Sequence, residues 1–125
     1  MAILLITHDL ALTAELCDRL VVLYAGRVAE VGPLEHLVRS PRHPYTSALL
    51  QSRPRVGMTG EIPTIPGAVA DLMRPPSGCR FHPRCPNALE VCAEVQPDLE
   101  QMVPGQRAAC HNPVPVREEV AASGR

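Results

Sequence analysis

Proline is distributed unevenly along this chain of 125 residues, and the imbalance limits what the second half can become. Eleven of the fourteen prolines lie between Arg53 and Pro115, where long apolar runs are rare. Proline interrupts helices and sheet ladders, so this half predicts loops and turns, with one helix expected over residues 86–95. Because such a segment buries little apolar surface, we expect a metal, a crosslink or a partner to offset the entropy of ordering it. Residues 118–125 are expected to be frayed.

The first half of the chain has long apolar patterns instead. The run AILLIT at residues 2–7 is short and rich in Ile and Leu, which is typical of a buried strand in a parallel sheet. Within residues 8–20, leucines at i, i+4 and i+8 predict an amphipathic helix of about three turns. Cys17 lies on the apolar face of that helix, where we expect a buried small side chain rather than a ligand.

A β-hairpin is expected after this helix. The runs RLVVLYAG and RVAEVG predict two strands that form a hairpin over residues 20–31, with Ala25 and Gly26 at its tip. Pro33 stands at the start of a helix predicted over residues 33–40. Pro44 leads into a second short helix, predicted over residues 45–52. Strands and helices together predict an α/β fold for this half.

Composition excludes several classes of function. The net charge of −1 provides no basic footprint for a nucleic acid. No run approaches the ~18–20 apolar residues that span a bilayer, and the first residues lack the basic region and cleavage site of a signal peptide. The sequence contains no Lys, so all twelve basic residues are Arg. We expect a reducing compartment, in which clustered cysteines bind metal or do redox work more often than they form disulfides.

Four of the five cysteines gather in the proline-rich half, with the spacing C-x5-C-x6-C-x17-C. This pattern predicts a metal site made by Cys79, Cys85, Cys92 and Cys110. The spacing departs both from zinc knuckles and from ferredoxin motifs, so zinc and an iron–sulfur cluster both stay open at this point. Three nearby arginines (Arg74, Arg80 and Arg84) would offset thiolate charge or simply face solvent. Two histidines beside cysteines, His82 and His111, are alternative ligands.

His8 follows the predicted strand and precedes the predicted helix. Ligands of open parallel sheets bind at the carboxyl ends of strands, where a histidine can donate to a phosphate oxygen or position a water. A structural role is the plainer interpretation, because Thr7 and Asp9 beside it are common helix-capping residues.

Longer stretches of the sequence carry a resemblance. ILLITHDL, LVVLYAGRVAEVGP and SPRHPYTSALLQSRP together resemble the C-terminal part of the ATP-binding subunits of ABC transporters. HPYT narrows the resemblance to the oligopeptide, dipeptide and nickel uptake class. The stretch IPGAVADLMRPPSGCRFHPRCPNALEVC, with one later cysteine, is similar to the C-terminal extension of those ATPases. The resemblance runs from about residue 3 to residue 113, and Ala70, where the family would have Pro, is a small departure.

The resemblance implies a division of the chain. Residues 1–53 would be the C-terminal remnant of a P-loop nucleotide-binding domain. Residues 54–115 would be a small, irregular Pro- and Cys-rich metal-binding extension, and residues 116–125 a disordered tail. His8 would match the switch histidine of the H-loop, which is catalytic and contacts the γ-phosphate of ATP bound with magnesium. The four cysteines would hold a [4Fe–4S] cluster, with zinc as the alternative.

The resemblance also implies partners and a location. These are transmembrane permease subunits, a second ATP-binding subunit and, through a binding protein, a peptide. The protein would lie at the cytoplasmic face of the inner membrane as a peripheral component. No nucleic acid is implied.

Three parts of the family's ATPase machinery are missing from the sequence. There is no G-x-x-x-x-G-K-[ST] run, no LSGGQ-like signature and no apolar strand that ends in Asp-Glu. We therefore expect a fragment that does not hydrolyse ATP alone, and whose unpaired strand at residues 2–7 favours aggregation or a partner. The alternatives are a stand-alone structural or redox metal-binding module and the remnant of a truncated gene.

Overall fold

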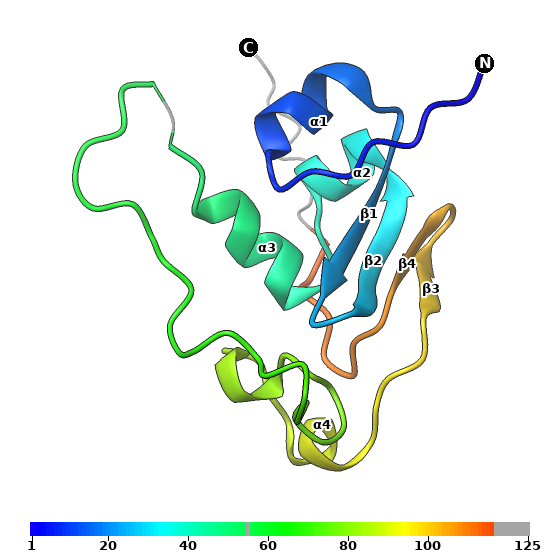
Figure 1. Cartoon of the computed structure of the whole chain (residues 1–125), viewed down its shortest axis with the longest axis vertical. Coiled ribbons are helices and arrows are strands. Elements are labelled where there is room, and N and C mark those ends of the chain that lie inside the picture. Colours follow the sequence, from blue (N-terminus) through cyan, green and yellow to red (C-terminus); the bar gives the residue numbers. More distant parts are fainter. Residues whose placement is uncertain (55, 117–125) are drawn as a thin grey trace.

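The computed structural model describes residues 1–54 and 56–116 of the chain. Figure 1 shows its elements around one small antiparallel sheet. In chain order these are α1 (Leu10–Leu16), β1 (Arg19–Tyr24), β2 (Arg27–Pro33), α2 (Leu34–Arg39), α3 (Pro44–Gln51), the 3-10 turn η1 (His82–Arg84), α4 (Glu90–Glu94), β3 (Glu100–Val103) and β4 (Gln106–Ala108). The chain is thus a small mixed α/β structure, as its first half predicts.

Residues 2–7 do not form the predicted strand of a parallel sheet. They are an exposed loop, in which Ile3, Leu4 and Ile6 are 80%, 88% and 87% exposed. A strand needs a neighbour to complete its backbone hydrogen bonds, and no segment within the described ranges pairs with this one. The prediction was wrong because a buried parallel strand depends on sheet neighbours, which the local run of Ile and Leu does not supply.

The first helix is shorter than predicted. It covers seven residues, and Asp9 caps its start by accepting hydrogen bonds from the amides of Ala11 and Leu12 at 2.9 and 3.1 Å. Its leucines stay largely exposed, with Leu16 at 66%. Cys17 ends the helix half-buried, so it is not the fully buried residue that the periodicity predicted.

The β1–β2 hairpin is confirmed, with Tyr24 opposite Arg27. Ala25 and Gly26 form its tip with positive φ angles of 48° and 80°. Two consecutive positive φ angles are typical of the tight hairpin turns whose twist matches that of the strands. The two predicted helices that follow are also present, as α2 and α3, each within a residue or so of the expected bounds.

A small aliphatic core lies between the hairpin and these helices. Val22, Ala29 and Leu37 are buried at its centre, and Leu20, Tyr45 and Leu49 pack against it. Each comes from an element that the apolar pattern of the first half predicts. The core therefore joins the elements of residues 19–51 into one packed unit.

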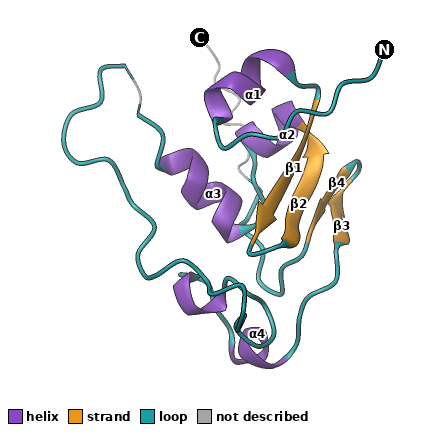
Figure 2. Cartoon of the chain, in the orientation of Figure 1, coloured by secondary structure: helices purple, strands orange, loops and turns teal. Residues whose placement is uncertain are grey.

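The proline-rich half contributes a second hairpin that the sequence did not predict. β3 and β4 turn at Pro104 and Gly105, and β4 pairs with β2 through Glu30 and Ala108, so the strand order is β1-β2-β4-β3. The resulting sheet has four strands, and Figure 2 shows them in orange. One sheet thus contains strands from both sides of residue 53.

Glu30 fixes this second pairing from inside the molecule. Its fully buried carboxylate accepts hydrogen bonds from the amides of Arg42 and His43 at 2.7 and 3.0 Å and from the Gln106 side chain at 2.6 Å. Gln106 also donates to the carbonyl of Ser40. Because a buried carboxylate needs such donors, Glu30 ties β2, the loop before α3 and β4 together.

The helix predicted over residues 86–95 is reduced to the five residues of α4. The first residues of that stretch form a turn instead, in which the amide of Ala88 bonds to the carbonyl of Cys85. The amide of Leu89 donates to the sulfur of Cys92. None of the described helices is long and apolar enough to cross a membrane. Most of the predicted tail, residues 117–125, lies outside the described residues.

Candidate functional site

The four clustered cysteines come from four short pieces of chain. Cys79 precedes the η1 turn and Cys85 ends it, Cys92 lies in α4, and Cys110 follows β4. The amide of Cys79 donates to the carbonyl of Cys92 at 2.7 Å, which brings the first and third cysteines side by side. We call residues 78–94 the cysteine segment. Figure 1 places it beyond the end of the sheet that carries the β1–β2 turn.

Gly78 makes this approach sterically feasible. Its φ is +66°, and a Cβ at this position would lie 2.3 Å from the carbonyl oxygen of Cys92. Any larger residue would push the two backbones apart and strain the chain at the same time. The glycine before the first cysteine is therefore part of what holds the cysteine segment together.

The thiols are partly buried and influence one another electrostatically. Burial raises the pKa of Cys79 and Cys85, and raises that of Cys110 to about 11. Each pair among the four cysteines adds a smaller, repulsive contribution in the same direction. Such mutual repulsion requires proximity, so the fold brings all four predicted ligands into one neighbourhood. All four are free thiols.

Proximity does not amount to a single-ion site. Within the described residues, no group of three or more His, Cys, Asp or Glu side chains is placed to hold a metal ion. The two alternative ligands are engaged elsewhere: a ring nitrogen of His82 lies 2.8 Å from the carbonyl of Cys79, and one of His111 lies 2.7 Å from that of Val95. The metal site thus stays a prediction.

Two of the three arginines near the cysteines, Arg80 and Arg84, bind backbone carbonyls, whereas Arg74 is exposed. Arg80 donates to the carbonyl of Ala25 at the tip of the β1–β2 hairpin. Arg84 donates to the carbonyls of Ile65 and Pro66 at 3.2 and 3.0 Å, and to the Tyr24 hydroxyl at 3.4 Å. Their structural use is therefore to attach the cysteine segment to the hairpin and to the proline-rich loop.

Phe81 anchors the cysteine segment to the first half of the chain. It is 1% exposed and packs edge-on against Tyr24 with ring centroids 5.0 Å apart. The rings of Tyr45 and His43 lie 5.3 and 5.9 Å away. All three aromatic residues of the chain thus meet at one point, between Cys79 and Cys85 on one side and the start of α3 on the other.

His43 is a residue that the sequence reasoning missed. Its Nδ1 accepts a hydrogen bond from the amide of Tyr45 at 3.0 Å and so caps α3, and the ring also bonds to the backbone of Ala109. Burial lowers the pKa of His43 to about 4, so the ring is neutral near pH 7. The position of His43 just before Pro44, at the start of a helix, was the available signal.

His8 lies in the exposed loop before α1. Thr7 and Asp9 on either side are linked by a hydrogen bond of 3.0 Å from the Asp9 amide to the Thr7 hydroxyl. The capping role expected for Asp9 is confirmed by the hydrogen bonds that its carboxylate accepts at the start of α1. His8 itself makes no hydrogen bond or ion pair to any described residue, and the structure does not test its predicted contact with a nucleotide.

Comparison with known proteins identifies relatives along most of the chain. The sequence model of the oligopeptide/dipeptide transporter, C-terminal region, matches residues 29–92. The oligopeptide transport ATP-binding protein OppD of Escherichia coli (strain K12) is 46% identical over 114 residues, which is 90% of this chain and 34% of OppD. The dipeptide transport ATP-binding protein DppD of the same strain is 42% identical over 115 residues, or 91% of this chain and 35% of DppD.

A third relative gives the same picture. The probable peptide ABC transporter ATP-binding protein y4tR of Sinorhizobium fredii (strain NBRC 101917 / NGR234) is 47% identical over 111 residues, or 87% of this chain and 33% of y4tR. The chain spans about a third of the length of these curated relatives.

Proposed function

Since the chain belongs to the family of the oligopeptide/dipeptide transporter C-terminal region, we propose that it acts as part of the ATP-binding subunit of a peptide-uptake ABC transporter. The resemblance predicted from the sequence is confirmed at the level of the family. The observation that carries the proposal is the 46% identity to OppD over 90% of the chain, a match that includes both the hairpin half and the cysteine segment.

In this role His8 is the residue that contacts the γ-phosphate of ATP. Support comes from its place in an exposed polar turn that leads into α1, with no described partner that competes for the imidazole. Phosphoryl transfer depends on groups that position the nucleotide and stabilise charge, and one histidine supplies only a part of that set. The P-loop lysine is missing because the sequence contains no Lys. The chain alone is therefore expected not to turn ATP over.

Phosphate release tests this expectation directly. The chain is incubated with ATP and magnesium beside the His8→Ala variant, and the two are expected to release no phosphate above the blank. Nucleotide turnover that His8→Ala abolishes would show that this chain is catalytic by itself and would overturn this part of the proposal.

The four clustered cysteines are proposed to hold an iron–sulfur cluster. Support comes from the partial burial of these cysteines near one another, which raises the pKa of Cys79, Cys85 and Cys110. A bound cation would have to displace the protons of these thiols. Tetrahedral zinc, with Zn–S bonds of about 2.3 Å, would need its sulfurs within roughly 4 Å of one another. In a cluster of several irons each thiolate binds a different iron, so the four sulfurs can lie farther apart than around one zinc ion.

We infer that this donor set suits such a group because it offers four free thiols, of which Cys79, Cys85 and Cys92 lie in or beside η1 and α4 and Cys110 follows β4. When bound, a [4Fe–4S] cluster would supply a covalent link among the four pieces of chain and a site for one electron. The chain's own contribution is to position the ligands: Gly78 permits the contact between Cys79 and Cys92, and Phe81 holds the η1 turn against the hairpin. Zinc is the alternative.

Metal analysis of the full chain decides between these options. The protein is expressed without oxygen, and iron, sulfide and zinc per chain are measured together with the absorption spectrum. Iron and sulfide in equal amounts are expected in the wild type and in Cys17→Ser, which alters the one cysteine outside the cluster. Cys85→Ser is expected to lose them. One zinc per chain would mean that the cysteines form a structural zinc site instead of a cluster. The absence of both iron and zinc would refute the metal proposal.

The partners follow from the same proposal. The relatives are ATP-binding components of peptide transporters, and we infer permease subunits and a second ATP-binding subunit as partners at the inner face of the membrane. The exposed apolar side chains of residues 3–6 and of β1, including Val21 and Leu23 at 52% and 58%, are a surface that such contacts would cover. The pairing of β4 with β2 joins the proline-rich half to the first half in one sheet. This favours a role as part of the ATP-binding subunit over a stand-alone metal-binding module.

A further inference from the structure

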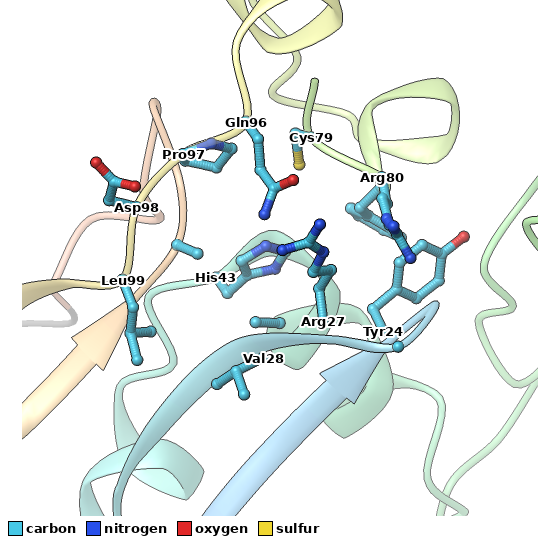
Figure 3. Close-up of a pocket in the computed structure, with 14 residues that line it drawn as sticks. Tyr24, Arg27, Val28, His43, Cys79, Arg80, Gln96, Pro97, Asp98 and Leu99 are labelled. Carbon is cyan, nitrogen blue, oxygen red and sulfur yellow. The ribbon is translucent and has the colours of Figure 1, made fainter. Parts of the chain in front are cut away.

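A pocket of about 380 Å³ lies beside the cysteine segment, and one of the proposed metal ligands, Cys79, is among the residues that line it. Small-molecule sites in proteins typically measure ~300–1,000 Å³, so this one has room for a small ligand. Its walls come from the β1–β2 hairpin tip, the start of α3, the loop before η1 and residues 96–99 (Figure 3). A ligand here would contact segments that are far apart in the sequence.

The charged side chains that line the pocket favour a ligand with one negative charge. Arg27 is exposed, and its side chain has no hydrogen bond or ion pair to any described residue, so its guanidinium is available. Arg80 uses one nitrogen on the carbonyl of Ala25. Asp98 is the one acidic residue among those that line the pocket, and in Figure 3 its carboxylate points away from Arg27. With His43 neutral, two arginines and one aspartate leave a net charge of +1.

The rest of the lining combines apolar side chains with the Gln96 amide, the Cys79 thiol and the Tyr24 ring. Val28, Pro97 and Leu99 line the side of the pocket formed by the second strand of the hairpin and the 96–99 segment. In Figure 3 the side chains of Gln96 and Arg27 reach into the pocket from opposite walls. An apolar surface with a few converging polar groups is the usual composition of a small-ligand site.

We propose that this pocket binds a small monocarboxylate with an apolar body, whose carboxylate pairs with Arg27 and whose chain lies against Val28 and Leu99. A guanidinium matches the planar carboxylate with two parallel hydrogen bonds. The single net positive charge suits a monoanion, whereas a phosphate monoester carries about −1.5 to −2 at pH 7. The proposal uses neither the nucleotide nor the metal, so it stands or falls independently of the proposed function.

N-acetyl-leucine is the probe for the test, because it combines one carboxylate, one amide and a branched apolar chain. It is titrated into the full chain while amide chemical shifts are followed by NMR. Saturable shifts are expected at residues 26–29 and 96–99. Arg27→Ala is expected to weaken binding at least about tenfold, since hydrogen bonds to charged groups are among the stronger ones. The matched control is Arg107→Ala, an exposed arginine on β4, which should bind like the wild type.

Three results would overturn the proposal. One is the absence of saturable shifts up to about 50 mM probe, well above the ~1 mM range expected of a weak specific ligand. The second is equal binding of the neutral amide N-acetyl-leucinamide or of inorganic phosphate. The third is unchanged affinity in a folded Arg27→Ala variant. The comparison of the acid with its amide uses only the wild type, so it decides the matter even where Arg27→Ala fails to fold.

Discussion

The hairpin half of the molecule and the cysteine segment are ordered by different means. Residues 19–51 bury Val22, Ala29 and Leu37 in a continuous core of strands and helices. Residues 56–99 bury little apolar surface, and Phe81 is their one large, fully buried side chain. The comparison teaches that a proline-rich segment with almost no core keeps its place through a few anchors, each of which therefore matters more than an average core residue.

The anchors of the cysteine segment are of three kinds. Phe81 inserts among the rings of Tyr24, Tyr45 and His43. Arg84 fastens the proline-rich loop by donating to backbone carbonyls. The backbone amide of Cys79 donates to the carbonyl of Cys92 at 2.7 Å. Removing anchors one at a time tests whether the two regions depend on each other.

Phe81→Ala is the strongest of these tests. Truncation of a buried Phe typically costs about 3–5 kcal/mol, and here it also empties the contact between the two regions. We expect the free energy of unfolding to fall by that amount, as measured by chemical denaturation of the full chain. Leu72→Ala is the matched control in the proline-rich loop just before the cysteine segment. Because Leu72 is 67% exposed, this substitution should change the free energy of unfolding by less than about 0.5 kcal/mol. Equal, small effects of both substitutions would show that the segment is not anchored by Phe81.

The local patterns of the first half account for what the sequence could predict. The alternation in β1 and β2, the Ala25-Gly26 tip and the two prolines before α2 and α3 are features of neighbouring residues, and the structure confirms the elements that they indicate. Residues 2–7 show the limit of such reasoning, since a buried strand is defined by neighbours that lie elsewhere in a sheet. The family was predictable because several such stretches occurred in one order.

The rest depended on contacts between distant residues. β4 is three residues long, and its place in the sheet is determined by pairing with β2 and by the bonds of Gln106 to Glu30, 76 residues away. No periodic pattern marks it. The spacing of the cysteines predicted a metal site, which stays a prediction because the described residues contain no group placed to hold a metal ion. His43 and Phe81 escaped notice because lone rings carry no periodic signal.

Acidification should weaken the point where the two regions meet. His43 has a pKa of about 4 in the folded chain, against 6.5 when unfolded, so the unfolded state binds more protons between these values. The contribution of neutral His43 to the free energy of unfolding is therefore fully present above about pH 6.5. It decreases by about 3 kcal/mol as the pH falls toward 4. The physical reason is that burial disfavours the charged imidazolium, and a protonated Nδ1 can also no longer accept the hydrogen bond from the Tyr45 amide.

The difference between two variants isolates this effect from other titrating groups. His43→Asn keeps a capping side chain but does not titrate, so its unfolding free energy should change less between pH 7 and pH 4 than that of the wild type. His36→Asn, at an exposed position, should follow the wild-type curve. Parallel curves for His43→Asn and wild type would mean that the ring is not buried as a neutral group.

Arg84→Lys is expected to have the smallest effect. The side chain donates to Ile65, Pro66 and Tyr24 from a partly exposed position, and a lysine ammonium lacks the fork that reaches several acceptors at once. We expect the free energy of unfolding to fall by about 1 kcal/mol, because two or three solvent-accessible hydrogen bonds are weakened while the positive charge is kept. Arg74→Lys is the control, since Arg74 is exposed and should be neutral to substitution.

Hydrogen exchange locates the effect of Arg84→Lys more sharply than global stability does. If the guanidinium holds the loop, protection should fall in the segment around residues 65–67 and stay unchanged in β1 and β2, whose order depends on the aliphatic core. Uniform loss of protection in both regions would mean that they unfold as one unit. The contrast between a region ordered by its core and one ordered by anchors would then have to be given up, and Phe81→Ala would be expected to destabilise the hairpin as strongly as the cysteine segment.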